Sequence, residues 1–321
     1  MLHATPRATE PQVGPETTTI ADTAERILAL VLRYGNCLDA SRARGERHLP
    51  KILRALRGGD PIDLVLPAFP AKSPNREKTL GSLPDYAEVL GLERLQKICD
   101  EIRTLHAPGA RVLVCSDGRV FSDLVLVSDE EVSEYGRAVR CMIQDLGLRS
   151  LRTFSMEDVF GDADFETMRM RLVRELGRSV EEIRADVRAN AEALAMFNGI
   201  HRFLFEDRLV LDRGKSRNRV REECKELAYQ VIQRSNAWSS LVEELFPHAL
   251  RLSIHPQFAH SPKIGFRLVD CDSAWGTPWH NVALLDRGGF RLVKRRDAEA
   301  RGAVLTLAHG KYPFYKELAL L

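Results

Sequence analysis

One stretch of the chain combines cations, neutral hydrogen-bonding groups and proline within a single predicted loop. It reads PAFPAKSPNREKTLGSLPD at residues 67–85, and its four prolines hold the backbone in a defined path. Its polar side chains of interest are the cations Lys72, Arg76 and Lys78 and the neutral Ser73, Asn75 and Thr79. This set suits a phosphate dianion, although the P-loop pattern GxxxxGK followed by Ser or Thr is absent. A solvated basic loop explains the same residues equally well.

A second segment, SDGRVFSDL at residues 116–124, carries two carboxylates, one guanidinium and two hydroxyls. Together these groups could bind a polyol and move protons. Gly118 allows the chain to turn tightly there. The structural alternative is an Asp-Gly turn at Asp117, followed by a helix that Asp123 caps.

Two later segments add a histidine, arginines and a serine. RLSIHPQ at 251–257 alternates, so that on a strand Arg251, Ser253 and His255 share one face. His255 could act as an acid or a base near neutral pH, although an isolated histidine is more often structural. RSNAWSSL at 234–241 begins with Arg234 at the end of a predicted helix, a place where arginine commonly only stabilises the helix. The aromatic residues at 275–281 either line a pocket or cap the core.

The first two segments each follow a short apolar run that predicts a buried strand, at 62–66 and at 111–115. Between them, apolar residues recur at three- and four-residue spacing over 86–105, which predicts an amphipathic helix. The same spacing predicts helices from residue 19 onward, within 42–57 and from 129 to about 200. Strand, helix and strand in this order favour a parallel sheet with covering helices, whose ligands bind beyond the carboxyl ends of the strands.

The periodicity of the apolar residues changes after residue 246. Three segments alternate at period two, which predicts strands that we expect to be antiparallel, with a hairpin at 286–289; the segments are 250–254, 265–269 and 289–293. We therefore expect a disordered leader at 1–18, an α/β catalytic domain at 19–247 and a β-rich portion at 248–321 packed on the same domain. The fold class is α/β with a Rossmann-like, mostly parallel sheet and an antiparallel C-terminal portion.

The composition narrows the class of protein. The chain has 321 residues and a net charge of +2, so no overall field draws it to nucleic acid or to an anionic membrane. Its six cysteines are widely spaced and do not form a zinc motif, which indicates free thiols in a reducing cytoplasm. No apolar run is long enough for a membrane span, and the N-terminus lacks the apolar region of a signal peptide.

Taken together, the four segments at 67–85, 116–124, 234–241 and 251–257 resemble those of the isocyanide (isonitrile) synthase family, also called the pyoverdine/dityrosine biosynthesis family. The resemblance implies a Rossmann-like α/β enzyme of secondary metabolism, of the carbon–carbon lyase type. It would join the α-amine of tyrosine or tryptophan to the ketone of ribulose 5-phosphate and leave one sugar carbon on nitrogen as the isocyanide. No metal or organic cofactor is implied. An iron/2-oxoglutarate oxygenase is the implied pathway partner.

This chemistry gives the candidate residues hypothetical roles. A phosphate clamp would use Lys72, Arg76, Lys78 and Arg119. Proton shuttles would be Asp117, Asp123 and His255. Arg234 or Arg251 would hold the amino acid's carboxylate. Lys72 could instead act as an amine base whose pKa its cationic neighbours lower. The remaining predicted substrate-binding residues are Ser73, Asn75, Ser116 and Ser235.

Two alternatives remain open from the sequence. A sugar-phosphate lyase would use Lys72 as a Schiff-base amine. A nucleic-acid-binding protein would use the basic segments near 42–57 and 213–221, although these lack interleaved aromatic residues. The sequence does not choose between tyrosine and tryptophan, and it does not indicate the oligomeric state.

Overall fold

The computed structural model describes residues 19–39 and 45–318, and the predicted leader at 1–18 lies outside them. A five-stranded sheet forms the centre of the molecule, and each of its neighbouring strands pairs in parallel. Its strands in spatial order are β3 (Leu151–Phe154), β2 (Ala110–Cys115), β1 (Ile62–Pro67), β4 (Leu250–Ser253) and β5 (Ile264–Gly265). The chain runs outward from β1 to β3 on one side and resumes at β4 on the other. The switch point of the sheet therefore lies between β1 and β4, where ligands bind in folds of this kind.

Helices cover both faces of this sheet, which explains why β1 reads as a nearly continuous apolar run. Leu64 and Leu66 of β1 belong to the larger core beneath α3, whereas Val65 belongs to a second core with Trp238 of α10. The helices of the first face are α1 (Ile20–Arg33), α2 (Leu49–Gly58), α3 (Tyr86–Arg103) and α5 (Asp129–Asp145). Capping boxes at Thr19, Asp85 and Ser128 fix where α1, α3 and α5 begin.

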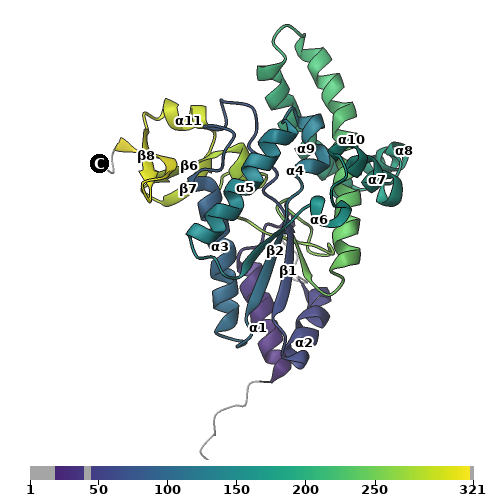
Figure 1. The fold of residues 1–321 in the computed structure, drawn as a ribbon, viewed down its shortest axis with the longest axis vertical. Helices are drawn as coiled ribbons and strands as arrows, with labels where there is room; N and C mark the ends of the chain where they lie inside the picture. Colours follow the sequence, from purple (N-terminus) through teal and green to yellow (C-terminus); the bar gives the residue numbers. More distant parts are fainter. Residues whose placement is uncertain (1–18, 40–44, 319–321) are drawn as a thin grey trace, which may run out of the picture.

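The second face and the upper part of the molecule consist of a helical group whose long member α10 (Arg217–Leu245) leads directly into β4 (Figure 1). Its other members are α7 (Phe165–Leu176), α8 (Val180–Ala189) and α9 (Ala191–Leu211). Shorter turns connect these elements: η1 (Glu46–His48), α4 (Gly118–Phe121), η2 (Ser122–Val125), α6 (Glu157–Phe160) and η3 (Pro278–His280). The helices predicted between 129 and 200 are present, but the strand β3 interrupts them.

A second sheet of four strands lies beside α3 (Figure 1). Its order is β7 (Gly289–Val293), β6 (Val282–Asp286), β9 (Tyr312–Lys316) and β8 (Val304–Ala308), with α11 (Arg295–Ala300) between β7 and β8 in the chain. The predicted hairpin at 286–289 is confirmed by the antiparallel pairing of β6 with β7. Tyr86 at the start of α3 packs against Phe290 and Phe314, with ring centroids 5.0 and 5.2 Å apart, and so joins the two sheets.

The prediction that 250–254 is an antiparallel strand is wrong. Strand β4 pairs in parallel with β1, with Leu64 opposite Leu250, because α10 carries the chain back across the sheet before β4 begins. The alternating run at 265–269 contributes only Gly265 to a strand, since β5 covers Ile264–Gly265. The expected boundary at 247 thus falls just before a strand of the central sheet.

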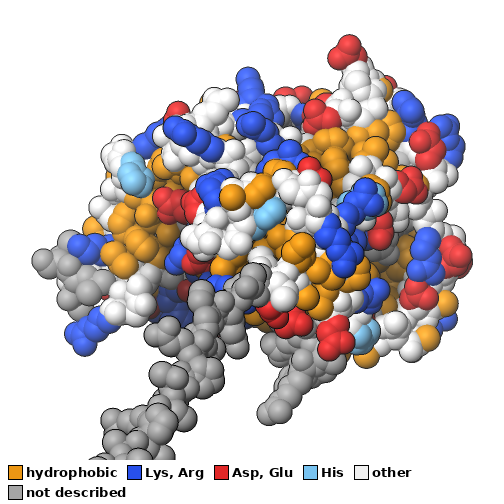
Figure 2. All heavy atoms as spheres, turned by 90° about the horizontal axis from the view of Figure 1, so that it is seen from below, with side chains coloured by type: hydrophobic (Ala, Val, Ile, Leu, Met, Phe, Trp, Pro, Cys, Tyr) orange, Lys and Arg blue, Asp and Glu red, His pale blue; other side chains and the backbone are white. Residues whose placement is uncertain are grey.

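Surface charge is mixed in sign. On the face shown in Figure 2, Lys and Arg side chains are interspersed with Asp, Glu and hydrophobic side chains. Over the part of the chain that the structure describes, no helix is long and apolar enough to cross a membrane. No group of His, Cys, Asp and Glu that could hold a metal ion occurs among the same residues.

Candidate active site

A cavity of about 320 Å³ opens at the carboxyl ends of β1, β2 and β4. The segment after each strand contributes to its wall: Lys72 and Ser73 after β1, Asp117 after β2, and His255 after β4. Ser235 of the segment 234–241 lines the same cavity, so all four sequence motifs meet at the switch point of the sheet. This is the position that the parallel-sheet interpretation predicts for a ligand.

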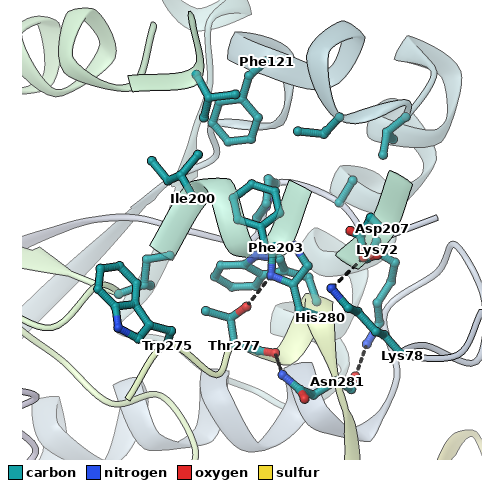
Figure 3. Close-up of a pocket in the computed structure, with 18 of the residues that line it drawn as sticks. Lys72, Lys78, Phe121, Ile200, Phe203, Asp207, Trp275, Thr277, His280 and Asn281 are labelled. Carbon is teal, nitrogen blue, oxygen red and sulfur yellow. Dashed lines mark hydrogen bonds and ion pairs between the residues drawn. The ribbon is translucent and has the colours of Figure 1, made fainter. Parts of the chain in front are cut away.

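The rest of the wall is largely apolar and comes from elements far apart in the chain. Phe121, Ile200 and Phe203 line one side, and Trp275 lies at the opposite end of the labelled residues from Lys72 and Lys78 (Figure 3). Phe203 also packs on the ring of His280, with centroids 5.0 Å apart. The cavity therefore has an aromatic region and a charged region, which suits a ligand with an apolar ring and polar groups.

The Lys72 ammonium is buried beneath this cavity within a cluster of charges. Its Nζ lies 2.9 Å from Asp85 and 2.8 Å from Glu88, and it donates to the carbonyl of Pro278 at 3.1 Å. The hydroxyl of Tyr135 donates to the other oxygen of Glu88 at 3.1 Å. Burial raises the pKa of Glu88 to about 7, although Lys72 opposes this shift. The loop after β1 is thereby fixed to the first turn of α3.

The expectation that Lys72 has a lowered pKa is wrong. Burial alone would lower the pKa of this ammonium, but the carboxylates of Asp85 and Glu88 outweigh burial and raise the pKa. The neighbours that matter are acidic, not the cations of the surrounding sequence. At neutral pH Lys72 is a charged group in an ion cluster, so it is unsuited to act as a free amine.

The middle of the same loop is held by helix α9. Lys78 lies 2.6 Å from Asp207 and 3.1 Å from Glu206, and Ser73 donates to Asp207 at 2.8 Å. Asn75 donates to the same carboxylate at 3.3 Å. Of the predicted binding residues in this loop, Ser73 and Lys78 line the cavity, whereas Asn75 serves the loop's own structure. Arg76 is exposed, lies outside the cavity lining and donates to Thr79 at 3.3 Å.

Asp117 lines the cavity and has a carboxylate oxygen without a hydrogen-bond partner among the described residues. This oxygen is buried, and burial raises the pKa of Asp117 to about 7. Gly118 next to it packs so tightly that a Cβ would lie 2.1 Å from the carbonyl oxygen of Pro70. Ser116 donates to the carbonyl of Phe69 at 3.1 Å and is not part of the lining. Asp117 is therefore placed to exchange a proton with a ligand.

Two histidines line the cavity as neutral imidazoles at neutral pH. Burial, aided by Lys263, lowers the pKa of His255 to about 4. Burial likewise lowers the pKa of His280 to about 4, and its Nδ1 is hydrogen-bonded to the hydroxyl of Thr277 at 3.0 Å. His255 packs on Trp275, with ring centroids 5.4 Å apart. A neutral imidazole can accept a proton, whereas a carboxyl group with a raised pKa can donate one.

The structure does not bring the predicted arginines into the cavity. Arg119 pairs with Glu157 and Asp129 and stacks on Phe165, and Arg251 is held by Glu243 and Ser239. Arg234 lies 2.6 Å from Asp123, so the structure pairs both of these candidates with each other. None of these four residues lines the cavity, whereas Ser235, the neighbour of Arg234, does.

Sequence reasoning missed the contribution of α9. Asp207 and Glu206 hold the loop after β1, and Phe203 and Ile200 form the wall beside it. Arg202 on the same helix is exposed at the cavity, and no described carboxylate lies within ion-pairing distance of its guanidinium. The usable signal was weak: Phe203, Glu206 and Asp207 recur at three- and four-residue spacing, as an inward helix face requires.

The parallel sheet with a cavity at its switch point places the molecule in the class of Rossmann-like α/β proteins. The family model of the pyoverdine/dityrosine biosynthesis proteins matches residues 52–305, and the chain belongs to this family. This confirms the resemblance noted from the four motifs.

Individual relatives and a solved structure agree with this assignment. The L-tryptophan isonitrile synthase AmbI2 of Fischerella ambigua is 48% identical over 84% of this chain and 81% of its own length. An L-tyrosine isonitrile synthase of Pseudomonas aeruginosa is 42% identical over 87% of this chain and 86% of its own. The crystal structure of the PvcA protein from P. aeruginosa matches with a TM-score of 0.86 and 40% identity, covering 92% of this chain and 99% of that one.

Proposed function

We propose that this chain is an isocyanide synthase that converts the α-amine of tyrosine or tryptophan into an isonitrile, with ribulose 5-phosphate as the carbon donor. The observation that carries the proposal is the convergence of all four family motifs on one cavity that has an aromatic wall and an unpartnered carboxylate oxygen. Relatives named as tryptophan and tyrosine isonitrile synthases support both the activity and the substrate class.

The cavity contains groups for both proton transfers that the first step requires. When the amine adds to the ketone, the resulting hydroxyl must leave as water, and an acid must protonate it. Asp117, with its pKa raised to about 7, is partly protonated near neutral pH and is our candidate for that acid. His255, neutral because its pKa is lowered to about 4, is our candidate for the base that removes protons beside the imine.

Arg202 is our candidate for the amino acid's carboxylate, in place of Arg234 and Arg251. Those two guanidiniums already pair with Asp123 and Glu243 away from the cavity. Arg202 lines the cavity, and Phe203 and Ile200 on the same helix provide the aromatic and aliphatic wall. An amino acid bound in this way presents its ring to the apolar region and its amine toward the strand ends.

After the condensation the sugar fragments and loses phosphate, so the enzyme is of the carbon–carbon lyase type. The expected location is the cytoplasm, and the expected consumer of the product is an iron/2-oxoglutarate oxygenase. The alternative of a lyase that uses a Lys72 Schiff base is disfavoured. The two carboxylates beside Lys72 keep its amine protonated and occupied.

The test is mass spectrometry of the purified protein with tyrosine or tryptophan and ribulose 5-phosphate that carries carbon-13 at its ketone carbon. We expect one labelled carbon on the nitrogen of the amino acid, and the two amino acids are compared in parallel. Borohydride treatment of enzyme with the sugar phosphate alone is the control, because a covalent adduct on Lys72 would indicate the lyase. Unlabelled product, or none with either amino acid, would overturn the proposal.

A further inference from the structure

A second cavity, of about 290 Å³, shares part of its wall with the first. His255 and Trp275 line both cavities and their rings are in contact, so this pair is the boundary between the cavities. Trp275 stands at the end of the first cavity that is remote from Lys72 and Lys78 (Figure 3). The second cavity therefore extends the site away from the buried charge cluster, past His255.

The second cavity contains an ammonium group without an ion pair. Lys263 lines it, and within the described ranges no carboxylate lies within 4.0 Å of its Nζ. Burial, aided by the nearby charge of Arg251, lowers the pKa of Lys263 to about 8, so the group is still largely protonated at neutral pH. Lys263 is half-buried, and a partly desolvated cation without a counter-ion is unfavourable in the free protein, which favours a site that an anion fills.

The acidic groups near this cavity do not form an ion pair with Lys263. Asp186 lies against Arg178, and Glu243 lies against Arg251. Glu192 also lines the cavity, and its charge and that of Glu243 partly oppose the lowering of the Lys263 pKa without forming an ion pair with the lysine. None of them pairs with Lys263, so an incoming anion would not have to displace a carboxylate from the lysine.

The lysines of the first cavity, unlike Lys263, all have carboxylate partners. Lys72 lies between Asp85 and Glu88, and Lys78 and Lys294 both pair with Glu206. A dianion that bound there would have to compete with four carboxylates, counting Asp207. The loop that the sequence offers as a phosphate clamp is therefore poorly suited to that task in the folded protein.

We propose that Lys263 and the second cavity bind the phosphate of the sugar phosphate, while the amino acid occupies the first cavity. The inference rests on the proposed function. In ribulose 5-phosphate the phosphate and the ketone are separated by several bonds, so a phosphate beside Lys263 leaves the ketone near the boundary at His255. This places the reacting carbonyl next to our candidate base and within the cavity that Asp117 lines.

A chain of hydrogen bonds holds the segment that carries Lys263 in place. Ser261 donates to the side chain of Gln257 at 2.8 Å, and Gln257 donates to Ser253 at 3.3 Å. The backbone N–H of Lys263 donates a hydrogen bond to the Ser261 hydroxyl at 3.4 Å. These contacts connect the lysine segment to the end of β4, so the motif RLSIHPQ would position the sugar phosphate through its loop, not through Arg251.

The first experiment compares Lys263→Gln, Lys263→Arg and wild type under steady-state conditions, with each substrate varied in turn. Removing the charge should raise KM for ribulose 5-phosphate about 10- to 100-fold, as expected for a hydrogen bond to a charged group, and leave KM for the amino acid within about twofold. Lys263→Arg should stay close to wild type. Lys225→Gln is the matched control, because Lys225 is a partly exposed lysine of α10 that pairs with Glu222 and lies outside both cavities. Equal KM values for the sugar in Lys263→Gln and wild type would overturn the assignment.

A second measurement does not depend on turnover. Inorganic phosphate is titrated calorimetrically into wild type and into Lys263→Gln, and we expect binding in wild type that weakens at least tenfold in the variant. If no isonitrile forms but phosphate binding depends on Lys263, the proposed function fails and the anion site stands. If isonitrile forms and both proteins bind phosphate equally, the site assignment fails and the function stands. Lys263→Arg that binds phosphate as wild type does shows that the site requires a cation at this position.

Discussion

The ammonium group of Lys72 and the carboxylate of Glu88 lie 2.8 Å apart, and neither side chain is exposed to solvent. This contact joins the loop after β1 to helix α3, and Asp85 completes the cluster at 2.9 Å from the same ammonium. Two residues of the family motif at 67–85, Lys72 in its first third and Asp85 at its end, thus meet in one buried ion cluster. Lys72 and Asp85 therefore stabilise the floor of the cavity through their ion pair.

Removing Lys72 should therefore destabilise the protein strongly. In Lys72→Met the carboxylates of Asp85 and Glu88 remain buried without their cation, which we expect to lower the free energy of unfolding by about 3–5 kcal/mol. Urea denaturation followed by circular dichroism measures this change. The control is Lys311→Met, which breaks an exposed ion pair with Asp145 at 2.7 Å and should lower the same quantity by less than about 1 kcal/mol. Similar losses in the two variants would contradict a special role of the buried cluster.

The raised pKa of Asp117 makes a distinct prediction for stability against pH. Its pKa is about 7 in the folded protein against 3.8 when exposed, so the folded state holds this proton more tightly. The resulting stabilisation is complete below pH 3.8 and is lost as the pH rises through 7, at up to about 1.4 kcal/mol per pH unit. The substitution Asp117→Asn removes this pH-dependent stabilisation. The difference in unfolding free energy between the variant and wild type should thus depend on pH between about 4 and 7. If the two unfolding free energies instead change in parallel with pH, the raised pKa of Asp117 is refuted.

The carboxyl group of Asp117 should also determine the alkaline limb of the dependence of kcat on pH. If Asp117 acts as the acid, kcat falls as the pH rises through about 7, and Asp117→Asn lowers kcat by about 100-fold and abolishes that limb. Asp123→Asn is the informative comparison, because Asp123 lies outside the cavity against Arg234. We expect it to retain the limb and most of kcat. Loss of the limb in Asp123→Asn, with Asp117→Asn active, would reverse the assignment.

The loops after β1 and β2, which carry the first two motifs, are in contact at Pro70 and Gly118. One added methyl group at Gly118 should disturb this contact. In Gly118→Ala the new Cβ would lie 2.1 Å from a backbone oxygen, so the loops after β1 and β2 must separate. We expect a loss of about 1–3 kcal/mol in unfolding free energy together with loss of activity. The control is Gly136→Ala in α5, where the nearest atom is a flexible Arg140 nitrogen at 3.6 Å. Because alanine favours a helix interior, that variant should gain about 0.5–1 kcal/mol.

The positions of the motif loops could be predicted from sequence because local patterns determine them. The strands β1 and β2 are apolar runs followed by proline or Asp-Gly, and the carboxyl ends of parallel strands meet at one edge of a sheet. The direction of β4 could not be predicted in this way. Alternation marks a strand, but only the path of α10 across the sheet decides that β4 runs parallel to β1.

The roles of the cations could not be predicted, because a sequence shows a charge without showing its partner. Arg119, Arg234 and Arg251 stand in family motifs, but their carboxylate partners are brought to them by folding. Lys263 and Arg202 stand outside those motifs and keep their charges unpaired among the described residues. The presence or absence of a carboxylate within a few ångströms decides which cation can meet a ligand, and this depends on the tertiary structure.

Arg202 provides the last prediction, which concerns the other substrate. Its guanidinium lies at the first cavity on the helix that also carries Phe203, so we expect Arg202→Gln to raise KM for the amino acid about 10- to 100-fold. KM for ribulose 5-phosphate should change by less than about twofold, the opposite pattern to Lys263→Gln. Arg213→Gln is the matched control, since Arg213 is exposed and lies outside both cavities. An amine that lacks the carboxylate, tyramine or tryptamine, should bind wild type and Arg202→Gln equally weakly. If Arg202→Gln instead weakened the sugar phosphate, the two cavities would have to exchange their assigned ligands.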